Sequence, residues 1–110
     1  MSQHFVKFIH GPLKCEVLVQ LGWDRPLQGF YLIAQKVETP HTSDADEGFI
    51  YENLSDCGHP KTLERFKAVS KELGLQIPDV MWRNAYQDSQ LQVVNQQKFY
   101  DIKGNLIAPF

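Results

Sequence analysis

The sequence has few of the residues that stabilise small secreted proteins or anchor a chain in a membrane. It contains two cysteines, Cys15 and Cys57, in 110 residues, which is too few for a disulfide scaffold. No segment approaches the roughly 18 consecutive apolar residues of a membrane helix. Lys7 and His10 interrupt the apolar residues near the start, where a secretory signal would be continuous. We therefore expect a cytoplasmic protein with no membrane partner.

Motifs for catalysis and cofactor binding are also missing. The sequence has no G-x-x-x-x-G-K phosphate loop, no G-x-S-x-G nucleophile turn and no pair of C-x-x-C metal motifs. Cys57 and His59 form a local thiol–imidazole pair, but residues two apart in a turn rarely face each other as nucleophile and base. We predict that the protein is not an enzyme and has no catalytic residue, metal or cofactor. Metal binding by Cys57 and His59 stays open.

Basic residues are absent from one region of the chain. Residues 38–60 contain six acidic residues and no lysine or arginine, whereas the segments on either side each carry a net charge of +2. A nucleic-acid-binding domain would need a basic face, so we expect no nucleic-acid partner. An acidic loop steers association toward positive surfaces. The charge pattern therefore favours a protein partner with a basic surface.

The composition is that of an ordinary globular domain. Hydrophobic residues make up 43% and charged residues 22% of the chain, as in most folded proteins. A chain of this length matches the commonest size of one domain. We therefore expect residues 1–110 to form a single domain.

Four segments in the first half have the composition of β-strands. Residues 4–10 are rich in β-branched and aromatic residues, and residues 14–21 alternate between apolar and polar side chains. Residues 29–38 are apolar on both faces in their first half, and residues 49–54 are again aromatic and β-branched. Consecutive strands with short connections usually pair as an antiparallel meander.

Two helices are expected in the second half. Leu63, Phe66, Val69 and Leu73 recur at helical spacing, with Thr62 or a residue before Pro60 as the cap and Gly74 as the left-handed C-terminal residue. Pro78 and Asp79 suit the first turn of a second helix. We expect this helix to end between Asp88 and Gln92. Its predicted buried side consists of Val80, Met81, Ala85 and Tyr86.

The tail, residues 97–110, contains short apolar segments around a turn with Gly104 in a left-handed conformation, which predicts a terminal strand or hairpin. The predicted fold class is α+β. It consists of a four-stranded antiparallel meander, two helices packed on one face, and a short C-terminal strand or hairpin.

The candidate contact residues lie in three places. The insert Gly22–Gly29 separates two predicted strands and places Trp23, Asp24 and Arg25 at a stiff loop tip, and tryptophan and arginine are frequent in binding hot spots. The alternative is that Trp23 folds back onto the sheet and Asp24 shapes the turn. The other candidates are the acidic loop residues Asp44, Asp46 and Glu47, and the helical pair Trp82 and Arg83.

These features predict a small protein-interaction module, such as an adaptor, an inhibitor or an immunity-type factor, without catalytic activity. The alternative is a ligand-binding or enzymatic domain with a pocket between the sheet and the helices, with His59, Asp56 or Tyr86 at its mouth. A homo-oligomer that associates through a sheet edge or through Met81, Trp82 and Tyr86 is compatible with either function.

Overall fold

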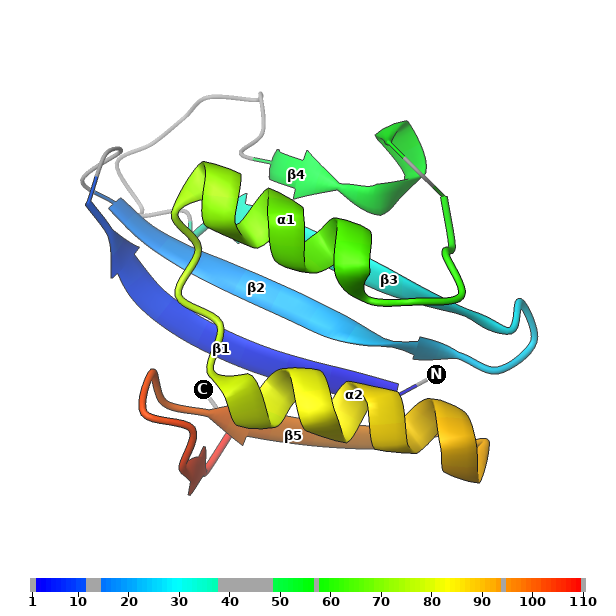
Figure 1. Cartoon of the computed structure of the whole chain (residues 1–110). Coiled ribbons are helices and arrows are strands. Elements are labelled where there is room, and N and C mark those ends of the chain that lie inside the picture. The colour runs from blue at the N-terminus through cyan, green and yellow to red at the C-terminus, as the bar shows by residue number, and fades with distance from the viewer. Residues whose placement is uncertain (1, 12–14, 38–48, 57, 94, 110) are drawn as a thin grey trace.

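The computed structural model describes residues 2–11, 15–37, 49–56, 58–93 and 95–109. One sheet and two helices make up most of it (Figure 1). The strands are β1 (Ser2–His10), β2 (Cys15–Asp24), β3 (Gly29–Lys36), β4 (Phe49–Glu52), β5 (Gln96–Tyr100) and β6 (Leu106–Ile107). The helices are a short 3₁₀ turn, η1 (Asn53–Ser55), followed by α1 (Glu64–Leu73) and α2 (Asp79–Leu91).

The sheet has six strands in the order β4-β3-β2-β1-β5-β6. Strands β1 to β4 form the predicted antiparallel meander, and the α+β class is confirmed. The sheet is larger than predicted and mixed, because the chain returns after α2 and places β5 beside β1 in parallel. The C-terminal hairpin that was predicted is β5 and β6, and it extends the sheet beyond β1.

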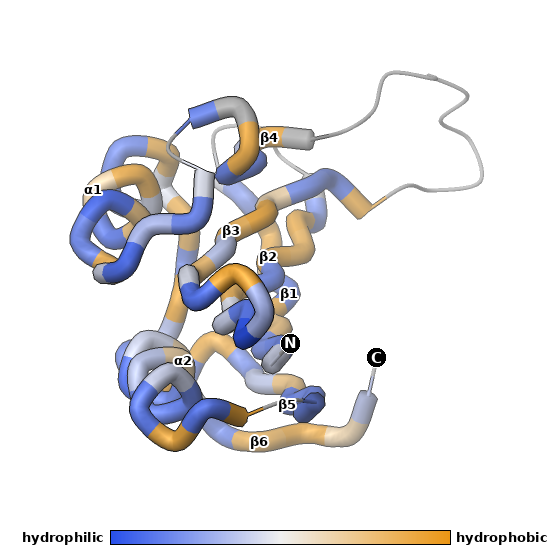
Figure 2. The backbone as a smooth tube through the Cα atoms, turned by 90° about the vertical axis from the view of Figure 1, so that its right-hand side faces the viewer, coloured by the Kyte–Doolittle hydropathy of each residue, from blue (hydrophilic) through white to orange (hydrophobic). Residues whose placement is uncertain are grey.

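Both helices lie on the same face of the sheet (Figures 1 and 2). Alternate residues of the strands point toward them, so Val6, Val19 and Leu32 are completely buried. Phe66 of α1 and Met81 of α2 meet this face and are also completely buried. The core therefore lies between one face of the sheet and the two helices, as the alternation in residues 14–21 predicts for β2.

The helix ends match the sequence prediction in part. Gly74 ends α1 in the left-handed conformation, with φ 69°, as predicted. The predicted cap is wrong, because Leu63 occupies the N-cap position without a side-chain hydrogen bond and α1 begins at Glu64, well after Pro60. In α2, Pro78 is the N-cap and Asp79 lies in the first turn. Neither described helix is long and apolar enough to cross a bilayer.

The connection between β2 and β3 is shorter than predicted. Strand β2 continues through Trp23 to Asp24, and the exposed turn is formed by residues 25–28. Trp23 pairs with Phe30 across the two strands, and the two rings make an edge contact at 5.1 Å. The prediction that Trp23 lies at a loop tip is therefore wrong, because only 5% of its surface is exposed. It belongs to the hydrophobic core.

Tyr31 packs over Gly22 on the adjacent strand. A β-carbon at Gly22 would lie 2.0 Å from the Ser2 carbonyl oxygen and 2.7 Å from the Tyr31 hydroxyl. The Tyr31 hydroxyl donates to that same Ser2 carbonyl at 2.7 Å and accepts a hydrogen bond from the Gln20 side-chain amide at 3.0 Å. Glycine is required at position 22 because the backbone of β1 and the Tyr31 ring occupy the space of a side chain.

Candidate functional site

A surface groove runs between α1 and α2. Its main hollow has a volume of about 380 Å³ and is lined by residues before and within α1 and by one side of α2. Trp82 and Leu63 are largely buried, with 8% and 7% of their surfaces exposed, and form its apolar floor. Tyr86 follows Trp82 by four residues, so both side chains lie on the same side of α2. The groove thus combines an apolar floor with an exposed aromatic ring.

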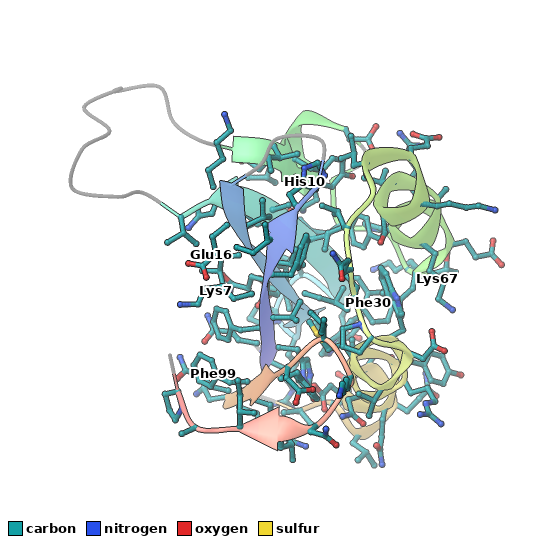
Figure 3. All side chains as sticks on the ribbon, turned by 90° about the vertical axis from the view of Figure 1, so that its left-hand side faces the viewer. Lys7, His10, Glu16, Phe30, Lys67 and Phe99 are labelled. Carbon is teal, nitrogen blue, oxygen red and sulfur yellow. The ribbon has the colours of Figure 1, made fainter. Side chains whose placement is uncertain are left out.

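The rim of this groove is predominantly basic. Lys61, Lys67 and Arg83 line the main hollow with Glu64 as the one carboxylate, and an adjoining hollow adds Asp79 beside Lys67 and Arg83. Within the described part of the chain, Lys67 and Arg83 form no ion pair. Figure 3 shows Lys67 projecting from the outer surface of the helix layer. The groove can therefore bring two unpaired cations to an anionic group without first breaking an ion pair.

The turn between β2 and β3 lies at one end of this groove. The Lys61 ammonium donates a hydrogen bond to the Gln28 carbonyl oxygen, and the Gln28 side-chain amide donates to Gln92, just after α2, at 2.6 Å. Gln28 has a positive φ of 49°, as the last residue of this tight turn. These contacts connect the turn to the segment before α1 and to the residue after α2. Arg25 is exposed on this turn.

The predicted contact residues have different surroundings in the structure. Arg83 is exposed and lines the groove, and Arg25 is exposed on the turn. Asp24 is 9% exposed, and its Oδ1 accepts a hydrogen bond from the Leu27 N–H at 3.2 Å, so it shapes the turn. Trp23 is in the core, as described above. Asp44, Asp46 and Glu47 lie outside the described residues.

The side of α2 predicted for self-association differs from the observed one. Met81 is completely buried and Trp82 nearly so, because both belong to the hydrophobic core. Tyr86, predicted on the buried side, is 56% exposed. The prediction of a self-association face made of Met81, Trp82 and Tyr86 is therefore wrong, since of the three only Tyr86 exposes substantial surface to a partner.

A second polar cluster lies beneath α2, and the sequence analysis missed it. The His4 imidazole on β1 contacts the Asp88 carboxylate through Nε2 at 2.5 Å and the Tyr100 hydroxyl through Nδ1 at 2.9 Å. The Asn84 side-chain amide donates to the Tyr100 hydroxyl at 2.8 Å. Burial raises the pKa of Tyr100 above its ordinary value. This cluster connects α2 with β1 and β5.

The arrangement resembles a catalytic triad only in its residue types. A catalytic base must reach a substrate, yet His4 is completely buried and Asp88 is 5% exposed. Neither residue lines a described hollow. The cluster therefore orients α2 on the sheet and leaves its ring nitrogens satisfied by protein groups.

The residues suggested for the mouth of a ligand pocket are also separated. Asp56 forms an exposed ion pair with Arg65, 2.8 Å from its Nε, and this pair raises the pKa of Arg65. His59 packs on Gly29, and its Nδ1 is buried without a hydrogen-bond partner. Among the described residues, no three His, Cys, Asp or Glu side chains cluster to hold a metal, and Cys57 is outside them.

Comparison with known proteins supplies no relative. No model of a protein family, no curated protein and no solved structure matches this chain. The candidate site accordingly rests on the geometry of the chain itself. Of its lining residues, sequence analysis identified Trp82 and Arg83 as contacts and placed Tyr86 at a pocket mouth. Glu64 and Lys67, which are exposed, were not predicted as contact residues.

Proposed function

We propose that this protein is an interaction module that binds a segment of a partner protein in the groove between α1 and α2. The observation that carries the proposal is the pairing of an apolar floor, Leu63 and Trp82, with the unpaired cations Lys67 and Arg83 at the rim. Such a surface complements a segment with one large apolar side chain flanked by carboxylates.

The charge of this groove selects a partner different from the one expected for the acidic loop. The groove favours an acidic segment, whereas residues 38–60 favour a basic surface. One partner that carries both charges, or two different partners, would satisfy the two surfaces. The groove is the stronger basis for a binding site because its side chains and their partners are described.

A ligand-binding function is the second candidate for the same place. A hollow of about 380 Å³ is within the size range of small-molecule sites, roughly 300–1,000 Å³. The predicted location between the sheet and the helices is filled by core side chains such as Phe66 and Met81. A small ligand would therefore bind at the helix surface, with its anionic group toward Lys67 and Arg83.

The test compares two double variants that change the net charge equally. Lys67→Glu/Arg83→Glu reverses the groove, whereas Lys71→Glu/Lys103→Glu reverses two exposed lysines that do not line the groove. Immobilised wild type and variants are exposed to native extract, captured proteins are identified, and the binding segment is mapped by titration calorimetry with overlapping peptides.

We expect wild type and the control variant to bind the same acidic segment, and the groove variant to lose it. The affinity should also fall as salt is raised, because surface charge contacts are screened. Equal capture by the groove variant would refute this site. If capture is instead lost in Arg25→Ala, the binding site lies at the turn. If a small anionic metabolite stabilises only wild type and the control variant, the second candidate is favoured.

A further inference from the structure

The outer edge of β1 is left partly unpaired by the sheet. Strand β1 runs from Ser2 to His10, but its pairing with β5 stops at Val6 opposite Tyr100. Beyond Tyr100 the chain turns away at Asp101 into the loop before β6. Among the described residues, the second half of β1 therefore has a neighbouring strand on one side only, which is β2.

The backbone of Ile9 points to this unpaired side. Ile9 lies opposite Glu16 in the antiparallel pair of β1 and β2. The Glu16 carbonyl faces β3, where it accepts the Val37 N–H at 2.9 Å. In an antiparallel ladder, opposite residues either exchange both hydrogen bonds or neither, so the N–H and carbonyl of Ile9 face away from β2. They project into the position that a continuation of β5 would occupy.

The carbonyl of Ile9 has only a weak partner at this edge. The Gln76 side-chain amide donates to it at 3.4 Å, which is longer than the roughly 2.9 Å of a good amide hydrogen bond. A main-chain N–H from an added strand would form a shorter bond there. The edge thus presents the donor and acceptor that β-strand addition uses.

A hollow of about 500 Å³ lies along this edge. Lys7, Ile9 and Glu16 line it from β1 and β2, and Ile102 and Ile107 line it from the opposite side. Ile9, Ile102 and Ile107 are 64%, 51% and 41% exposed, so apolar surface faces solvent on both walls. Figure 3 shows Lys7 and Glu16 on the sheet face away from the helices.

We infer that this edge binds an extended, apolar segment of a partner protein, which adds to β1 as a strand in line with β5. The part of β1 beyond its pairing with β5, residues 7–10, spans about 13 Å at roughly 3.3 Å per residue, which is long enough for a short added strand. The Ile9 N–H and carbonyl supply the main-chain hydrogen bonds, and β-branched side chains of the segment cover Ile9 and Ile107. This site is separate from the groove between α1 and α2 and stands or fails independently of it.

The first measurement is amide hydrogen exchange on the free protein. The Ile9 amide should exchange much faster than those of Phe8 and His10, whose positions in the ladder face β2. Slow exchange at Ile9, equal to that of its neighbours, would show that its N–H is already paired and would overturn the inference.

The second measurement uses the peptide acetyl-Thr-Val-Thr-Val-Thr-amide at millimolar concentration as the probe. Its binding should shift the Ile9 amide resonance and slow its exchange, and the same peptide N-methylated at both valines should do neither. Absence of a shift at Ile9 with the unmodified peptide would overturn the inference. Lys67→Glu/Arg83→Glu should bind the probe as wild type does, which separates this site from the groove.

Matched variants test the two walls. Ile9→Pro removes the edge N–H at a position where proline is tolerated in strands and should weaken the probe's binding about tenfold, the loss of one hydrogen bond. If this variant unfolds, Ile107→Ser still tests the hollow. It should weaken binding, whereas Leu106→Ser, at a more exposed neighbour outside the hollow, should not. Equal weakening by both serine variants would contradict the site.

Discussion

The His4 imidazole and the Asp88 carboxylate meet 2.5 Å apart between β1 and α2, although 84 residues separate them in the sequence. The other ring nitrogen of His4 contacts Tyr100 on β5. The three side chains thus join the first strand, the second helix and the fifth strand at one buried point. They determine how α2, and with it one wall of the groove, sits on the sheet.

Removing Asp88 should destabilise the protein. Asp88→Ala leaves a buried imidazole nitrogen without its partner, so the free energy of unfolding should fall by about 1–3 kcal/mol. Gln87→Ala, an exposed neighbour on α2, should change it by less than about 0.5 kcal/mol. Urea denaturation of both variants measures the difference. Losses of the same size would show that the contact contributes nothing beyond the helix position.

Trp23 should behave as a core residue. Trp23→Ala removes a buried ring that packs on Phe30, so the expected loss is about 3–5 kcal/mol. Arg25→Ala, two residues later on the exposed turn, should be nearly neutral. Thermal and urea unfolding of the two variants provide the check. A small loss for Trp23→Ala would restore it as a candidate surface contact.

Gly22 should not accept even the smallest side chain. In Gly22→Ala the new methyl group meets the Ser2 carbonyl and the Tyr31 ring, and relieving this overlap should cost about 1–3 kcal/mol. Gly11→Ala is the control, since a β-carbon at Gly11 would have nothing within 4 Å of it. If both alanine variants have the same melting temperature, the close approach of β1 to Gly22 is wrong.

Stability should decline at high pH through Tyr31. Burial raises the pKa of Tyr31 from 10.0 to about 12, and burial also raises the pKa of Tyr100. Because the folded state disfavours ionisation, the stabilisation is complete below pH 10 and is lost as the pH rises from 10 to 12. For Tyr31 this amounts to about 3 kcal/mol.

The control for this pH dependence is Tyr31→Phe, which removes the ionisable group. Urea unfolding between pH 8 and 12 should show a smaller decline for the variant than for wild type. Absorbance at 295 nm follows tyrosinate formation in the same samples. A decline of equal slope in both proteins would assign the effect to other groups, lysines included.

The local parts of the fold could be predicted because their signals are periodic. The spacing of Leu63, Phe66, Val69 and Leu73 identifies α1, and Gly74 marks its end. The same reasoning, applied fully, would have found Trp23, because Val17, Val19, Leu21 and Trp23 alternate without interruption along β2. The turn residues Asp24 to Gly29 outweighed that alternation in the prediction, so the strand was ended three residues early.

The pairing of β1 with β5 had no such local signal. Parallel neighbours are brought together by the intervening helices, and the composition of neither strand indicates which strand it pairs with. The same limit applies to the groove, since Lys67 and Arg83 belong to different helices and their proximity depends on how both pack. His4 is a partial exception, because it shares the inward alternation of Val6 and Phe8, a position where histidine requires partners.

The parallel pairing of β1 with β5 also affects how the protein is made. Residues 96–100, which complete one side of residues 2–6 in the sheet, are synthesised 94 residues after the residues they pair with. A growing chain can form the β1–β4 meander first, but one edge of β1 must wait until α1, α2 and β5 have been made. Closing so long a loop slows folding, and an open strand edge attracts other chains. We therefore expect the nascent chain to depend on chaperones, or on slow synthesis at low concentration, until β5 has emerged from the ribosome.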